Sequence, residues 1–196
     1  MSFYSTDNPD RRDRIMSASL KLFVHKGFFN TSVHEIREKA DVSIGLLYRY
    51  FKNKKDIAAA LYTELIQITN EVVGTLIDEH ETAHDRCRAI MFHYLHLTET
   101  FPELVEYIFF IRHREILQNK TQICASSGSK KTLTVIHEGI ESGEIRKMSP
   151  DVAMVALFGG MFRIIQKRLD GVLQNPVTVY QDELWEASWL AVSASR

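Results

Sequence analysis

Apolar residues recur at intervals of three and four along most of this chain, and that spacing favours helices. The clearest stretch spaces six apolar residues by four, four, three, four and four, which predicts a long amphipathic helix from Lys54 to about Glu79. These residues are Ile57, Leu61, Leu65, Ile68, Val72 and Leu76. No segment alternates apolar and polar residues as a half-buried strand does. The sequence therefore predicts an all-α protein.

Three shorter helices are predicted before the long one. The first covers about residues 15–26 and ends at Gly27, where a glycine cap follows a basic last turn. The second begins at Ser32, because a glutamate three residues later completes the pattern of a capping box. Ser43 is a natural N-cap for the third helix, over about residues 44–51.

The rest of the chain also has the signals of helices. They are expected at about 84–100, 102–117, 130–142, 150–170 and after Asn175-Pro176. Ser149 and Pro150 have the form of an N-cap followed by a proline in the first helical position. The sum is about nine helices, which we divide into an N-terminal three-helix domain over residues 1–53 and a larger helical domain over residues 54–196.

Several classes of protein are excluded by composition. The longest nearly apolar run, residues 152–162, has 11 residues, whereas a membrane-spanning helix needs about 20. The N-terminal residues lack the apolar core of a secretory signal, so we expect a cytoplasmic protein without membrane contact. Cys87 and Cys124 have neither the number nor the spacing of a disulfide framework or zinc site, and they fit a reducing compartment.

Charge is distributed unevenly along the chain, although the formal net charge is only −1. Residues 1–55 hold 11 Lys and Arg against 6 Asp and Glu, a net of +5, and residues 56–196 hold 13 against 19, a net of −6. A basic end joined to an acidic remainder indicates nucleic-acid binding at that end. Chance clustering of solvated charge is the alternative.

The segment from Ser32 to Phe51 has the dimensions of a helix-turn-helix. Asp41 occupies the turn, where a residue that tolerates left-handed backbone is needed. Residues 43–46 form the first turn of the second helix, and Gly45 there allows a close approach to base edges. Apolar residues suited to the inside are Leu22, Phe23, Ile36, Ala40, Val42, Leu47 and Phe51. Flanking donors suited to phosphate contacts are Thr31, Ser32, Tyr48, Tyr50 and Lys54.

This region resembles the DNA-binding domain of the TetR (tetracycline-repressor type) family. The likeness rests on a VS-x-G-x-LY-x-[HY]-F-x-[ND]-K core over residues 42–54 and on an LF-x-x-x-G sequence over residues 22–27. Two positions depart from the family pattern. Asp41 stands where a glycine is expected, at some cost in a left-handed turn, and Arg37 stands where an alanine is expected.

The resemblance implies a homodimeric transcriptional regulator, here taken as a repressor that a small-molecule effector releases from a double-stranded, palindromic DNA operator. The residues expected to read base edges are Ser43, Ile44, Gly45 and Leu46, with Arg49 as a further candidate. The residues expected at backbone phosphates are Thr31, Ser32, Tyr48, Tyr50 and Lys54. For Tyr48, a place in the apolar core is the open alternative.

Aromatic and methionine residues gather in the middle helices, where they suit either a plain core or a cavity for an effector. Pockets between the helices of a bundle are common ligand sites. The candidates are Met91, Tyr94, Tyr107, Phe110, His113, Phe158 and Phe162. Arg112 and His113 are placed to meet an acidic head group, and the expected effector is otherwise small and hydrophobic.

The helix over 150–170 is apolar nearly all round from Val152 to Phe162, which is more than one buried face requires. One side is expected to pack within the subunit and another against a second copy. Gly159 and Gly160 allow close helix packing, and the last helix adds two large aromatic side chains. The expected interface residues are Ala156, Gly160, Ile164, Trp185 and Trp189. The resemblance implies the same two helices.

A metal- or redox-responsive regulator of the same fold is the alternative function. His80 and His84 are spaced i, i+4, and Cys87 lies between them and a second histidine pair at His93 and His96. No third ligand has a clear spacing, so we expect neither a metal nor another cofactor. The sequence has no G-x-S-x-G, Walker or H-E-x-x-H motif, and no enzyme activity is expected.

Overall fold

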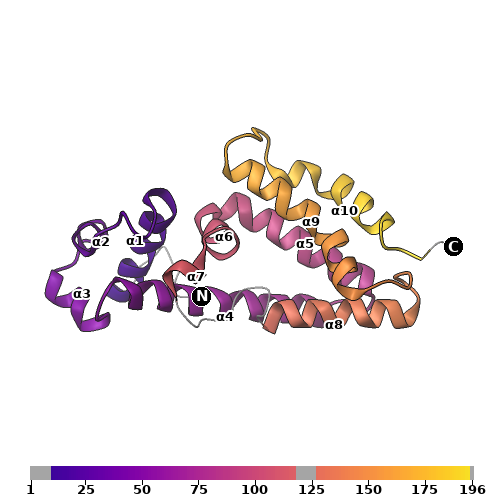
Figure 1. Cartoon of the computed structure of the whole chain (residues 1–196), viewed down its shortest axis with the longest axis horizontal. Coiled ribbons are helices and arrows are strands. Elements are labelled where there is room, and N and C mark those ends of the chain that lie inside the picture. The colour runs from indigo at the N-terminus through magenta and orange to yellow at the C-terminus, as the bar shows by residue number, and fades with distance from the viewer. Residues whose placement is uncertain (1–9, 118–126, 195–196) are drawn as a thin grey trace. The chain divides into compact units, whose positions relative to one another are not determined.

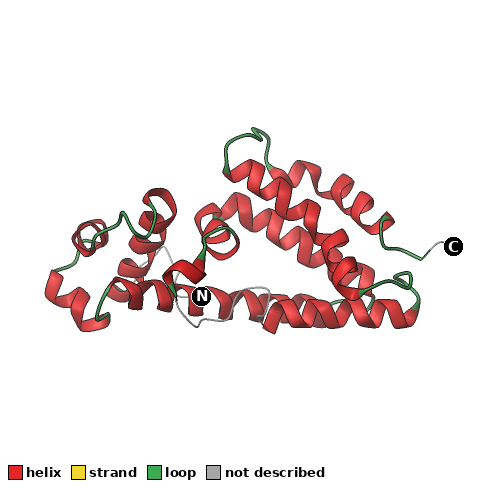
Figure 2. Cartoon of the chain, viewed as in Figure 1, coloured by secondary structure: helices red, strands yellow, loops and turns green. Residues whose placement is uncertain are grey.

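The computed structural model describes residues 10–117 and 127–194, and helices make up most of that length (Figure 1 and Figure 2). The all-α prediction is confirmed. An isolated antiparallel bridge joins Ile145 to Ser193. Cys124 lies outside the described residues. Among the described helices, none combines the length and the apolar character that a bilayer crossing requires.

The helices follow the predicted order, with one break that was not expected. They are α1 (Arg11–Lys26), α2 (Val33–Ala40), α3 (Ile44–Tyr50), α4 (Lys54–Asp78), α5 (Ala83–Thr100), α6 (Pro102–Phe109), α7 (His113–Ile116), α8 (Ser127–Ser142), α9 (Pro150–Leu169), the 3-10 helix η3 (Val177–Tyr180) and α10 (Gln181–Leu190). The single helix predicted over 102–117 was wrong. It is interrupted because the amides of Phe110 and Ile111 both donate to the Glu106 carbonyl, which ends α6.

The chain forms two compact units. The first unit spans residues 1–66 and 106–121, and the second spans residues 67–105 and 122–196. Helices α4 and α6 therefore each contribute to both. The division at residue 53 that the sequence predicted stays a prediction.

In the first unit, α1, α2 and α3 enclose a small apolar core. Its buried residues include Ile15, Met16, Phe23, Ile36, Ala40, Leu47 and Phe51. Each of the three helices begins on a local side-chain cap, from Asp10, Ser32 and Ser43 in turn. Tyr107, from the 106–121 segment, stacks on Phe23 with ring centroids 6.5 Å apart and donates its hydroxyl hydrogen to the Ala58 carbonyl at 3.1 Å.

In the second unit, α5, α8, α9 and α10 pack against one another (Figure 1). Contacts between distant parts of the sequence connect them. The Glu144 carboxylate accepts hydrogen bonds from the backbone amides of Ala83 and His84 at the start of α5, both at 3.1 Å. The Glu99 carboxylate pairs with Arg168 of α9 and accepts from the Val177 amide at 2.8 Å. Long-range polar contacts therefore connect the start and the end of α5 to other parts of this unit.

Candidate functional site

The first turn of α3 presents an open surface. Ser43 is the N-cap, and its hydroxyl oxygen accepts a hydrogen bond from the Leu46 amide at 3.2 Å. Ser43 and Gly45 are exposed, and Ile44 and Leu46 are half-buried. A Cβ atom added to Gly45 would have no neighbour within 4 Å. Among the described residues of the first unit, none therefore blocks the approach of a partner to Gly45.

Helix α3 has one buried face and one exposed face, as a helix that reads DNA requires. Leu47 is completely buried and holds the helix to the core. Tyr48, Arg49 and Tyr50 are all exposed, with exposed fractions of 52% for Tyr48 and 43% for Tyr50. The core position that was left open for Tyr48 is therefore wrong. Its phenol is accessible to an external phosphate.

Of the two predicted donors in the turn before α2, Ser32 and Thr31, the structure brings only one to the surface. Ser32 is exposed and forms both halves of the predicted capping box with Glu35. Thr31 is 2% exposed, and its hydroxyl donates to the Gly27 carbonyl at 2.8 Å. The Thr31 hydroxyl is thus turned inward, and we leave it out of the proposed DNA contacts.

Asp41 adopts the left-handed conformation that the turn needs, with φ of 51° and ψ of 58°. Arg14 of α1 supports it, because one guanidinium nitrogen lies 3.0 Å from the Asp41 carbonyl oxygen and 2.7 Å from its carboxylate. A cation at the C-terminal end of α2 also suits the helix dipole. Arg37, the second departure from the family pattern, is half-buried and pairs with the neighbouring Glu38.

Lys54, the first residue of α4, is engaged inside the unit. Its ammonium nitrogen lies 2.6 Å from the carbonyl oxygens of both Phe28 and Thr31. It also lies 4.4 Å from the centre of the Phe28 ring. Burial lowers the pKa of Lys54. The phosphate contact that the sequence predicted for Lys54 competes with these interactions.

Glu35 is held in its charged form. The Lys26 ammonium donates to its carboxylate, and the backbone amide and hydroxyl of Ser32 donate to it as well. These donors lower the pKa of Glu35 from 4.5 to about 2. The Glu35 carboxylate of the capping box therefore keeps its charge at pH values below 4.5.

The predicted effector-binding residues are divided between the two units. Met91, Tyr94 and Phe158 are buried in the second unit, and Phe162 there is half-buried. In the first unit, Tyr107 is fully buried and committed to Phe23 and Ala58, so it belongs to the core.

His113 and Phe110, also in the first unit, are half-buried. The His113 Nε2 atom lies 2.5 Å from the Tyr107 carbonyl oxygen, and its ring lies against Tyr62 with centroids 4.3 Å apart. Burial lowers the pKa of His113. The neutral imidazole therefore lacks the charge expected to meet an acidic head group. Arg112 is exposed and pairs with Glu115.

The predicted dimer residues differ in their accessibility. Trp185 is 4% exposed, and its indole N–H donates to His84 Nε2 at 3.1 Å, so it is enclosed in its own subunit and we leave it out of the proposed interface. Trp189 stacks on Trp185 and is half-buried. Ala156 and Ile164 are half-buried, and Gly160 is exposed. A Cβ on Gly160 would lie 3.1 Å from Leu184, so this glycine allows α9 and α10 to pack closely.

A different part of α9 is open. Val152 and Val155 have exposed fractions of 57% and 69%. Arg163 is exposed on the same helix, two turns after Val155, with Gly159 between them. These four residues form one stripe, which we call the α9 stripe, because their spacing of three and four places them on one face.

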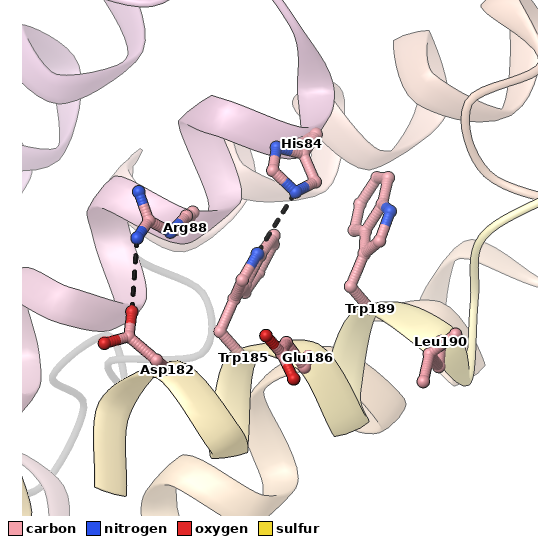
Figure 3. Close-up of a pocket in the computed structure, with 7 residues that line it drawn as sticks. All are labelled: His84, Arg88, Asp182, Trp185, Glu186, Trp189 and Leu190. Atoms are coloured by element: carbon pink, nitrogen blue, oxygen red, sulfur yellow. Dashed lines mark hydrogen bonds and ion pairs between the residues drawn. The ribbon is translucent and has the colours of Figure 1, made fainter. Parts of the chain in front are cut away.

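A shallow pocket of about 490 Å³ lies between α5 and α10 (Figure 3). Its lining residues are His84, Arg88, Asp182, Trp185, Glu186, Trp189 and Leu190. Most of its polar groups pair with one another, since Arg88 contacts Asp182 at 3.2 Å and Trp185 donates to His84. Few groups are thus left to bind a ligand.

The histidines and Cys87 are the residues on which the metal- or redox-responsive alternative depends. Over residues 10–117 and 127–194, no three His, Cys, Asp or Glu side chains group in a way that would hold a metal ion. Cys87 is buried, and burial raises the pKa of its thiol to about 12. Since the thiolate is the reactive form of cysteine, Cys87 is poorly suited to redox sensing.

Sequence reasoning missed Arg14 and the internal partners of Lys54. Arg14 acts on a residue 27 positions away in the chain, and no local pattern marks such a pair. For Lys54, the motif identified the residue but not its partners, since two backbone carbonyls leave no signal in residue type.

The sequence of this chain is similar to those of known bacterial regulatory proteins. Residues 15–61 match the model of a family described as bacterial regulatory proteins, tetR family. Over 150 residues the chain is 29% identical to the uncharacterized HTH-type transcriptional regulator YhgD of Bacillus subtilis (strain 168), a match that covers 73% of this chain and 76% of that protein.

Solved structures share the whole fold. A TetR family transcription regulator from Marinobacter aquaeolei VT8 superimposes with a TM-score of 0.80 at 19% identity, covering 94% of this chain and 96% of that one. FadR from Bacillus subtilis, solved in complex with stearoyl-CoA, has a TM-score of 0.73 at 22% identity, with 89% and 96% covered. These relatives are transcriptional regulators rather than enzymes.

Proposed function

Because this chain belongs to the TetR family of DNA-binding transcriptional regulators, we propose that it represses transcription from a palindromic operator and is released by a small, largely apolar effector. Such a protein acts where the chromosome is, in the cytoplasm. The observation that carries the proposal is the open first turn of α3, in which an N-cap serine and an unobstructed glycine stand on a helix anchored by the buried Leu47.

We assign base reading to the exposed end of α3, with Ser43, Ile44, Gly45, Leu46 and Arg49 at the major groove. Most of these side chains are small or apolar, so we expect contacts to thymine methyl groups and a contribution from DNA shape. Ser32, Tyr48 and Tyr50 are exposed donors beside this surface and are assigned to phosphates.

A palindromic operator needs two copies of the chain. We propose that the α9 stripe, with Trp189 and the half-buried Ala156 and Ile164 beside it, contributes to a symmetric four-helix interface of α9 and α10. Val152 and Val155 form an exposed apolar pair one turn apart on α9, which supports this choice. The two reading helices would then enter successive major grooves, about 34–36 Å apart.

We place the effector among the apolar side chains of the second unit. Met91, Tyr94, Phe158 and Phe162 supply aromatic and thioether surface there. FadR, which shares the fold, binds stearoyl-CoA in its solved complex, so an acyl chain is the first chemistry to test. Helix α4 belongs to both units and would carry the change to the reading helices. By linkage, the effector weakens DNA binding only as far as it prefers the non-binding conformation.

The test has two stages. Selection from a random duplex pool by the purified full-length chain should return a palindrome bound with strong salt dependence, and failure to enrich any sequence would reject operator binding. Stearoyl-CoA, stearate and coenzyme A are then added to the complex. Release by the first two but not by coenzyme A supports an apolar effector site. A matching titration with Zn²⁺ would release the DNA only under the metal-responsive alternative.

A further inference from the structure

We propose that His84 makes the packing of α10 on α5 depend on pH, because its neutral imidazole accepts a hydrogen bond from α10 and its protonated form would not. Helix α10 belongs to the proposed dimer interface, so weaker packing in acid would loosen the dimer. That consequence rests on the proposed function, whereas the contact between the two helices does not.

Two contacts define the protonation state of the His84 ring. The indole N–H of Trp185 donates to Nε2 at 3.1 Å (Figure 3). An indole nitrogen can only donate, so Nε2 must carry a lone pair. Nδ1 lies 2.8 Å from the Asp85 carboxylate, whose pKa is lowered by the side chains of His84 and Thr82. An ionised carboxylate only accepts, so Nδ1 carries the hydrogen and the imidazole is neutral in this arrangement.

A proton on Nε2 would remove the contact with Trp185. Both ring nitrogens of a charged histidine are donors, so two N–H groups would face each other across the present 3.1 Å. Trp185 is buried, and a buried donor without an acceptor is costly. The side chain of His84 is half-buried, so a proton can reach it from solvent. Helix α10 would then have to shift before the indole N–H could find water.

The charged groups around His84 do not cancel this effect. They are Asp85 and Glu144, which bind its ring and its backbone amide, and Arg88, Asp182 and Glu186, which line the same pocket. The residues outside α10 remain near His84 whether or not α10 is packed there. Of the two on α10, Asp182 is paired with Arg88 at 3.2 Å. Glu186 is exposed, where charge–charge interactions are weak.

Tryptophan fluorescence reports on this contact without a label. Trp185 and Trp189 are the two tryptophans of the sequence, and their ring centroids lie 5.0 and 4.8 Å from that of His84. The emission of the full-length chain is followed from about pH 8 to about pH 5, the interval in which histidine ordinarily changes charge. Hydrogen exchange of the α10 amides, expressed as protection factors, measures the packing of the helix itself.

Two variants accompany the wild type in both measurements. His84→Gln keeps a hydrogen-bond acceptor within reach of Trp185 but cannot gain a proton. His137→Gln is the matched control, because it removes an exposed histidine from α8 of the same unit.

We expect the wild-type emission to shift reversibly to longer wavelength as the pH falls, because the indoles gain access to water. The protection factors of α10 should fall about tenfold over the same interval, the size of one lost hydrogen bond to a buried donor. Both quantities should stay constant in His84→Gln. His137→Gln should behave as the wild type does.

Three results would overturn the proposal. Constant emission and protection in the wild type would mean that the packing does not depend on pH. An equal change in His84→Gln would assign the dependence to another group. Protection that rises in acid would mean that the imidazolium is held by the face of the Trp189 ring, since an indole face attracts a cation.

A second variant keeps the test decisive if His84→Gln fails to fold. Trp185→Phe removes the N–H that opposes the proton, so the fall in α10 protection should disappear, and a fall that persists would reject the proposal. None of these measurements uses DNA. A failure of the proposed operator binding is therefore distinguishable from a failure of this inference.

Discussion

Helices α1, α2 and α3 of the first unit and the helices of the second unit are capped in different ways. Asp10, Ser32 and Ser43 cap α1, α2 and α3 from within three residues of the amides they bind. In the second unit, by contrast, α5 receives the distant Glu144 besides its own N-cap threonine. Helix α8 is bound at Gly128 by Asn70, which lies on α4.

This difference explains why one region is recognisable from sequence and the other is not. A local cap is a fixed pattern of residue types at a short spacing, so a sequence motif can include it. A long-range cap depends on two segments that the fold brings together, so many pairs of residues can serve. The match to the family model accordingly covers residues 15–61, which include most of α1 and all of α2 and α3.

The largest expected effect tests the open surface of α3. Gly45→Glu should lower operator affinity by at least about a hundredfold, because a carboxylate placed against phosphates costs several kcal/mol. Since a Cβ at this position meets nothing within 4 Å, the unfolding temperature should stay close to that of the wild type. Fluorescence anisotropy with the selected operator measures the first quantity and calorimetry the second. Retained affinity would remove Gly45 from the interface.

The next effect concerns a long-range cap. Glu144→Ala should lower the free energy of unfolding by about 2 kcal/mol, since two amides at the start of α5 lose their acceptor. Urea denaturation of the full-length chain measures this. Glu141→Ala provides a control, because Glu141 is an exposed glutamate near the end of α8. Equal stability of the two variants would mean that the Glu144 contact contributes nothing.

The loss of a local cap should lower the free energy of unfolding less than the loss of the Glu144 contact does. Ser32→Ala removes the N-cap hydroxyl of α2 and should cost about 1 kcal/mol. Ser32→Thr, which keeps a hydroxyl that can accept from the Glu35 amide and donate to the Glu35 carboxylate, should recover most of that loss. The same denaturation experiment compares both with Glu144→Ala. A loss larger for Ser32→Ala than for Glu144→Ala would reverse the comparison between the two regions.

The smallest effect is a dependence on pH. The pKa of Glu35 is lowered from 4.5 to about 2, first by Lys26 and then by Ser32. A lowered pKa stabilises the folded state above the ordinary value, and that contribution is lost as pH falls from 4.5 towards 2. Glu35→Gln should therefore differ from the wild type at pH 6 and converge with it near pH 2. A difference in stability that stays constant over that range would contradict the assignment.

Several local features of the structure were predicted correctly from the sequence. The capping box at Ser32 and Glu35, the glycine end of α1 and the buried Leu47 all follow from residue type and spacing, and each is present. The signature at Ser149 and Pro150 predicted the start of α9 correctly, yet Ser149 makes no capping hydrogen bond with its side chain. The residue pattern there predicted where α9 begins, but Ser149 caps the helix without the expected side-chain hydrogen bond.

The tertiary structure decided what each candidate side chain touches. Thr31 and Lys54 have the residue types of phosphate ligands, but folding turns their polar atoms towards carbonyls of the unit. Asp41 replaces a glycine, and its support comes from Arg14, far away in the chain. Helical periodicity and local caps depend on residues that are close together in the chain, so they can be predicted from the sequence alone. The engagement of a particular donor depends on which distant backbone groups the packing places beside it.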